Sequence, residues 1–132
     1  LFRFDGIVTV WLALDPCDRE NGCMKVLPGS HRGPARQYAE VDRSTNLFPT
    51  AIRGPMDESQ AVYFELNANE CSFHDARIVH GADANTSSRR RCGYTMRYFD
   101  LALKYTVGPV NAGHRIWHCR GSNIAGNPLE QF

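Results

Sequence analysis

Two residues with complementary chemistry, His80 and Arg91, stand eleven positions apart, and the segment between them is rich in Gly, Asn, Asp and Ser. Imidazole is a common ligand of iron and other transition metals, whereas a guanidinium group pairs with a carboxylate through two hydrogen bonds. A fully extended chain would separate them by roughly 36 Å. A turn at 81–88 would instead fold the strand that opens with Arg91 back beside the strand that ends at His80. We therefore expect both side chains to face one cavity.

Such a cavity suits a ligand with a metal-chelating end and a distant carboxylate, and 2-oxoglutarate is a molecule of this kind. On an extended strand over 91–99, alternate side chains share a face. The face that carries Arg91 is polar and contains a glycine that leaves room, and its members are Arg91, Gly93, Thr95 and Arg97. We expect this face to line the cavity.

The elements that must position these residues are short strands. Segments rich in β-branched, aromatic and other apolar residues and bounded by turn formers predict strands at 7–14, 23–27, 61–66, 71–74, 77–80 and 91–99. Asn21-Gly22 between the first two is a hairpin signal. Helix is a minor component, so the pattern favours one antiparallel sandwich or barrel domain over 1–132. The polar segment 32–58, with prolines at 34, 49 and 55, is expected to be a surface lid or insertion.

Composition excludes several classes of partner. The net charge of +1 and the scattered cations provide no basic surface for nucleic acid. The longest nearly apolar stretch, 7–14, is far shorter than the roughly 20 residues that span a bilayer. Five cysteines without a C-x-x-C pair argue against a disulfide framework and a structural zinc site, and they favour reduced thiols in a cytoplasmic protein. We expect neither nucleic acid nor membrane as a partner.

Several motifs occur together and in order. An apolar strand that contains Trp11 leads to Asn21-Gly22 and then to Pro28-Gly29-Ser30-His31. Later in the chain come His80-Gly81, Asn85, Ser87, Arg91 and Arg97-Tyr98. From about Leu1 to Asn127 the chain resembles the phytanoyl-CoA dioxygenase family of iron(II)- and 2-oxoglutarate-dependent oxygenases. The order of the motifs makes this resemblance more specific than any one of them alone.

The resemblance implies a double-stranded β-helix, also called a jelly roll or cupin-like fold, with iron(II) held by two histidines and one carboxylate. His80 matches the distal iron ligand and Arg91 the residue that binds the far carboxylate of 2-oxoglutarate. Trp11 and Asn85 match positions near that cosubstrate, and Thr9 shares the strand face of Trp11. The implied reaction is the hydroxylation by O2 of an unactivated carbon in a small-molecule substrate, with release of succinate and CO2. The lid over 32–58 would protect it.

The sequence also departs from the family pattern. The two other iron ligands belong to an H-x-D motif, which this sequence lacks, and by the family spacing it would lie shortly before Leu1. We therefore expect a domain that is incomplete at its N-terminus and a fragment that is inactive alone. Ala82 stands where many members have serine. His74-Asp75 is no substitute, because adjacent strand residues point to opposite faces.

Other roles compete with these. A halogenase of the same fold would carry a small residue in place of the carboxylate ligand, and a non-catalytic β-barrel binding domain would lack a complete metal site. The H-x-D position distinguishes them. Arg89 and Arg90 are expected to be surface cations, and His31 to order the turn before it. Nothing in the sequence indicates the identity of the substrate or the oligomeric state.

Overall fold

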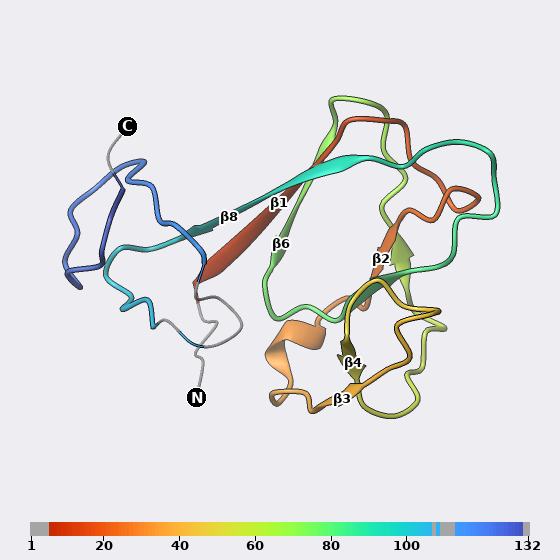
Figure 1. Cartoon of the computed structure of the whole chain (residues 1–132), viewed down its shortest axis with the longest axis horizontal. Coiled ribbons are helices and arrows are strands. Elements are labelled where there is room, and N and C mark those ends of the chain that lie inside the picture. The colour runs from red at the N-terminus through yellow and green to blue at the C-terminus, as the bar shows by residue number, and fades with distance from the viewer. Residues whose placement is uncertain (1–5, 107, 109–112, 131–132) are drawn as a thin grey trace.

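The computed structural model describes residues 6–106, 108 and 113–130. Within them the chain is almost entirely strand and loop, which confirms the mainly all-β prediction (Figure 1). A 3-10 helix, η1 (Ser30–Arg32), interrupts the strands. The strands are β1 (Ile7–Ala13), β2 (Met24–Val26), β3 (Tyr38–Glu40), β4 (Thr50–Ile52), β5 (Val62–Tyr63), β6 (Cys71–Asp75), β7 (His80–Ala82) and β8 (Gly93–Phe99).

The longest strands form an antiparallel sheet in the order β6-β1-β8. Trp11 of β1 lies opposite Ser72 of β6 and Thr95 of β8. Directly opposed residues of antiparallel strands share a face of the sheet. The face that contains Trp11, called the inner face below, therefore consists of Thr9, Trp11, Ala13, Ser72, His74, Gly93, Thr95 and Arg97. The expected alternation along β8 is confirmed for its last three members.

A second antiparallel sheet has the order β5-β2-β7. It packs against the first through a small core in which Trp11 and Ala13 of β1 meet Met24 of β2, together with Cys17 and Cys23. In Figure 1 this sheet lies beside one end of the long strands β1 and β8. The inner face of the first sheet thus meets the second sheet, and the two enclose the core between them.

The connection between β6 and β7 is a corner, and here the sequence prediction was wrong. We expected a strand over 77–80 that ends at His80, but β7 begins at His80. The amide of Ile78 donates to the Asp75 carbonyl, which forms a turn after β6. The corner is needed because β6 belongs to the first sheet and β7 to the second. For the same reason β7 and β8 are not neighbours, so the expected return strand beside His80 is also wrong.

The hairpin expected at Asn21-Gly22 is absent from the described residues, because β1 and β2 belong to different sheets. The turn itself is present, since the Gly22 amide donates to the Arg19 carbonyl. Gly22 has a φ of +76°, and a Cβ atom there would lie 2.6 Å from the carbonyl oxygen of Asp83. Glycine is thus required both by backbone conformation and by the close approach of the 83–85 loop.

The segment 32–58 contains the strands β3 and β4, which pair with each other as a hairpin. The sequence did not predict these strands, because the segment is polar and broken by prolines. Most of its residues are exposed, including Leu47 and Phe48 near the tip of the hairpin. A surface position is therefore observed, and its role as a lid stays a prediction.

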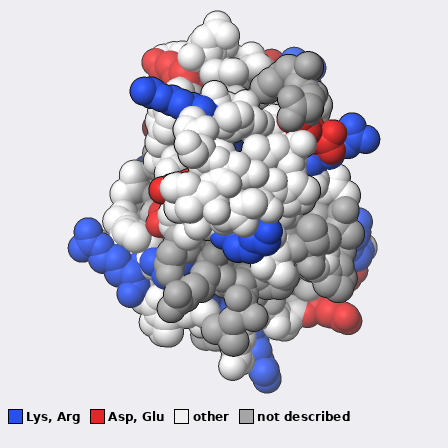
Figure 2. Space-filling view, turned by 90° about the vertical axis from the view of Figure 1, so that its left-hand side faces the viewer, with Lys and Arg blue, Asp and Glu red and all other residues white. Residues whose placement is uncertain are grey.

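The surface charge, the helix and the cysteines of the structure bear on the classes of partner considered above. On the face shown in Figure 2, Lys and Arg side chains are separated by uncharged surface and by acidic groups. No helix among the described residues has the length and apolar character needed to cross a membrane. All five cysteines are free in the structure.

Candidate functional site

His80 opens β7 with an exposed side chain. Its Nδ1 lies 2.7 Å from the carbonyl oxygen of Ile78. Because a carbonyl only accepts, Nδ1 carries the proton and the lone pair of Nε2 is left for another partner. A backbone carbonyl that fixes the tautomer in this way is the usual support of a metal-binding histidine. The ring of His80 also lies 5.6 Å, centroid to centroid, from that of His74 on the inner face.

The Pro28-Gly29-Ser30-His31 motif is hydrogen-bonded to Val79, the residue immediately before β7 and His80. The Ser30 hydroxyl accepts a hydrogen bond of 2.8 Å from the Val79 amide. The Leu27 amide donates to the Val79 carbonyl at 2.9 Å. Residue 79 is thereby fixed on both sides by the motif. Ser30 makes this contact, whereas Nδ1 of His31 is buried without a hydrogen-bond partner among the described residues, so the turn-ordering role expected for His31 stays a prediction.

His74 occupies the middle of the inner face, opposite Thr9 and adjacent to His80. It is buried, and its Nδ1 has no hydrogen-bond partner. Burial lowers the pKa of His74, and the positive charges possible on His80 and Arg97 lower it further. Asp75 points to the opposite face. In the part of the chain that the structure describes, no three His, Cys, Asp or Glu side chains gather as a metal site.

The three consecutive arginines differ in their partners. Arg89 pairs with Asp18 at 2.7 Å and with Glu20 at 3.2 Å. The guanidinium of Arg90 forms a fork on the Asp15 carboxylate, with two hydrogen bonds of 2.8 Å. The view of both as simple surface cations was therefore incomplete.

Arg91 is oriented differently from its two neighbours. Its guanidinium carbon lies 5.7 Å from the centroid of the Trp11 ring. Among the described residues it has no carboxylate partner. Of the three cations, Arg91 is thus the one available to an external carboxylate, and it stands beside the inner face.

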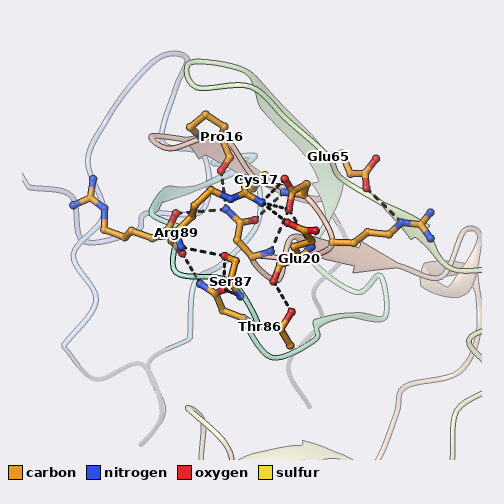
Figure 3. Close-up of polar contacts among 12 residues, drawn as sticks. Pro16, Cys17, Glu20, Glu65, Thr86, Ser87 and Arg89 are labelled. Carbon is orange, nitrogen blue, oxygen red and sulfur yellow. Dashed lines mark hydrogen bonds and ion pairs between the residues drawn. The ribbon is translucent and has the colours of Figure 1, made fainter.

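Asn85 and Ser87 fold the loop that leads to Arg91. Figure 3 shows Ser87 in this loop beside Thr86 and Arg89. The Asn85 side chain donates to the Arg89 carbonyl at 2.6 Å and accepts from the amide and hydroxyl of Ser87. Thr86 donates through its amide and hydroxyl to the Glu20 carbonyl. Asn85 is therefore part of the turn expected at 81–88, and its contact with a cosubstrate stays a prediction.

Gly93 is the residue that admits the Trp11 ring. A Cβ atom on Gly93 would lie 2.1 Å from Cζ2 of Trp11. The space that the sequence assigned to a ligand at this glycine is thus filled by the indole. Thr9 and Trp11 are both buried on the inner face, as their alternation predicts.

We expect Gly93→Ala to destabilise the protein by about 1 to 3 kcal/mol, the usual cost of an overpacked core. The buried ring of Trp11 cannot move without disturbing the core around it. Urea unfolding of the intact protein measures the change. Gly113→Ala is the matched control, because a Cβ atom there meets nothing within 4 Å. Equal stability of the Gly93→Ala variant and the wild type would contradict the steric argument.

A separate hollow of about 670 Å³ lies between β8 and the 113–120 segment. Its lining includes Thr95 and Arg97 of the inner face, but neither His80 nor Arg91. The candidate site is therefore defined by contacts to the inner face: His80 through His74, and Arg91 through Trp11. Within the described part of the chain, Nε2 of His80 and the Arg91 guanidinium have no hydrogen-bond or carboxylate partner, and by their chemistry they fit a metal ion and a carboxylate respectively.

The family model "Phytanoyl-CoA dioxygenase (PhyH)" matches residues 2–93 of the chain. A curated relative is the peroxisomal phytanoyl-CoA dioxygenase of Rattus norvegicus, which is 29% identical over 101 residues. That match covers 75% of this chain and 30% of the relative. The chain thus spans about a third of the length of the curated relatives it matches.

Solved structures resemble the chain as well. EvdO2 of Micromonospora carbonacea var. aurantiaca, solved with 2-oxoglutarate, is 28% identical with a TM-score of 0.61, covering 69% of this chain and 37% of that one. The epimerase SnoN, solved with Fe3+, alpha-ketoglutarate and nogalamycin RO, is 32% identical with a TM-score of 0.56, covering 74% of this chain and 36% of that one. These likenesses confirm the prediction of an incomplete double-stranded β-helix.

Proposed function

The chain belongs to the phytanoyl-CoA dioxygenase family, and from this premise we propose that it forms the cosubstrate-binding part of an iron(II)- and 2-oxoglutarate-dependent dioxygenase. His80 would hold the metal through Nε2, and Arg91 would bind the far carboxylate of 2-oxoglutarate. The single observation that carries the proposal is that the Arg91 guanidinium lies over Trp11 with no carboxylate partner among the described residues, while both neighbouring arginines form ion pairs.

The remaining residues would shape the space between these two groups. Thr9 and Trp11 form a buried floor on the inner face, and Asn85 holds the loop that leads to Arg91. When bound, iron(II) and 2-oxoglutarate supply the oxidising chemistry, in which O2 is consumed and succinate and CO2 are released. The protein residues described here bind and orient the cosubstrate, and the 32–58 segment would limit access of water as a lid.

Hydroxylation of an unactivated carbon in a small molecule is the finer part of the proposal. Support comes from the family match, whereas the neighbour SnoN is an epimerase. A product heavier than its substrate by one oxygen atom would support hydroxylation, and an unchanged mass would support a rearrangement. We also propose a cytoplasmic location, which five free cysteines support.

The intact protein is expected to form succinate when it is supplied with iron(II), 2-oxoglutarate and O2. The succinate released is measured by mass spectrometry. Omission of iron, with a chelator present, is the control. If the intact protein neither formed succinate nor bound iron, this would favour a binding domain without a metal centre.

A further inference from the structure

The residues on both sides of Arg91 are held by one carboxylate, that of Asp15. Oδ1 and Oδ2 of Asp15 accept hydrogen bonds of 2.8 Å from the Arg90 guanidinium. Oδ2 also accepts a hydrogen bond of 3.0 Å from the Cys92 amide. A single side chain thereby holds the residue before Arg91 and the residue after it.

The backbone adds to this bracket. The Cys92 carbonyl accepts hydrogen bonds from the amides of Leu14 at 3.0 Å and Asp15 at 3.2 Å. On the other side, the side-chain Nδ2 of buried Asn21 donates to the Arg90 carbonyl at 3.5 Å. Arg91 lies between these fixed residues, and its guanidinium is placed over the Trp11 ring and not on Asp15.

The 85–90 loop, which precedes Arg91, is bonded to the 16–21 segment, which follows Asp15. Figure 3 shows the 16–21 and 85–90 segments interlocked, with Arg89 and Thr86 directed at the loop that contains Glu20. Asp18 and Glu20 of that loop pair with the Arg89 side chain. Asp15 differs from them because it accepts a hydrogen bond from the backbone amide of Cys92, next to Arg91. Its side chain is only 20% exposed, although the Arg90 side chain is 76% exposed. The Arg90 guanidinium holds the pKa of Asp15 below its usual range.

We propose that Asp15 is a positioning residue for Arg91: by bonding Arg90 and the Cys92 amide, it fixes the direction in which the Arg91 guanidinium meets the cosubstrate carboxylate. This inference rests on the proposed function of Arg91. It predicts that Asp15 affects 2-oxoglutarate affinity through Arg91 and not independently. Asp15 touches neither the cosubstrate nor the metal in this account.

A double-mutant cycle tests the proposal by direct binding. Calorimetry measures the Kd for 2-oxoglutarate in the intact protein, with nickel(II) as a redox-inert ion in place of iron. Asp15→Asn keeps an oxygen that can accept from the Cys92 amide but removes the charge that holds Arg90. We expect it to raise the Kd about tenfold in the wild type and less than about twofold in the Arg91→Ala variant, because coupled residues are not additive.

Glu65→Gln is the matched control, since it also removes a carboxylate from an ion pair, with Arg19, but one that includes neither neighbour of Arg91. It should leave the Kd unchanged. If Asp15→Asn does not fold, Arg90→Gln removes the same ion pair from the other side and should show the same dependence on Arg91.

The outcomes separate the two proposals. A wild-type Kd in Asp15→Asn, or an equal rise in both backgrounds, overturns the positioning role while the proposed function stands. A wild type that does not bind 2-oxoglutarate, or an Arg91→Ala variant that binds it normally, overturns the proposed function and this inference with it.

Discussion

Arg91→Ala is expected to raise the Kd for 2-oxoglutarate about a hundredfold, which corresponds to about 3 kcal/mol for the loss of a charged, two-pronged contact. Arg91 is the member of its triplet without a carboxylate among the described residues, so no internal ion pair must break before a ligand binds. Arg91→Lys keeps the charge but loses the planar fork, and we expect about a tenfold rise. Calorimetry with nickel(II) in place of iron measures both values.

Arg19→Gln is a close control for this substitution. Its guanidinium also lies over an aromatic ring, 4.1 Å from the centroid of Tyr63, and it pairs with Glu65. Removal of Arg19 should therefore alter the local surface and leave the Kd for 2-oxoglutarate within about twofold. If Arg19→Gln and Arg91→Ala weakened binding equally, the effect would be one of general charge and the anchoring role of Arg91 would be wrong.

The first strand was predictable because its residue types are local signals. The β-branched and aromatic residues of 7–14 gave β1 within one residue, and alternation placed Thr9 and Trp11 on one face. What alternation does not contain is the identity of the neighbouring strand. Asn21-Gly22 therefore predicted a hairpin where the chain passes from one sheet to the other.

For the same reason His80 was expected at the end of a strand, whereas it begins β7. The apolar residues before it resemble a continuation of a strand, yet the chain uses them to turn between sheets. That both His80 and Arg91 face one cavity stays a prediction. The His80 ring lies near the His74 ring, and the Arg91 guanidinium lies near the Trp11 ring. His74 and Trp11 both belong to the inner face of the first sheet.

Residue types indicated the two chemical groups of the candidate site but not their supports. Asp15-Pro16 has the signature of a turn, and nothing in it predicts a bond to the Cys92 amide far along the chain. Ser30 is likewise a turn residue whose hydroxyl reaches Val79. Gly93 was expected to leave space for a ligand, whereas the ring that fills it comes from another strand. Such long-range contacts leave no periodic pattern in a sequence.

His80→Ala is expected to lower the affinity of the intact protein for iron(II) by more than about a hundredfold. Loss of a supporting residue beside a metal ligand typically costs 10- to 100-fold, so the loss of a ligand itself should exceed that range. Succinate formation should fall to the level seen without iron. Metal content after dialysis and the rate of succinate formation measure the two effects independently.

The fold should survive this change, because the His80 side chain is exposed and its strand is held by backbone contacts to β2 and by the bond from Val79 to Ser30. His118→Gln is the matched control, since His118 is also exposed and also bonds a backbone carbonyl, that of Gly121, at 2.7 Å. It should bind iron like the wild type. Normal iron binding by a folded His80→Ala protein would remove His80 from the metal site and leave Arg91 as a carboxylate-binding residue without an adjacent metal.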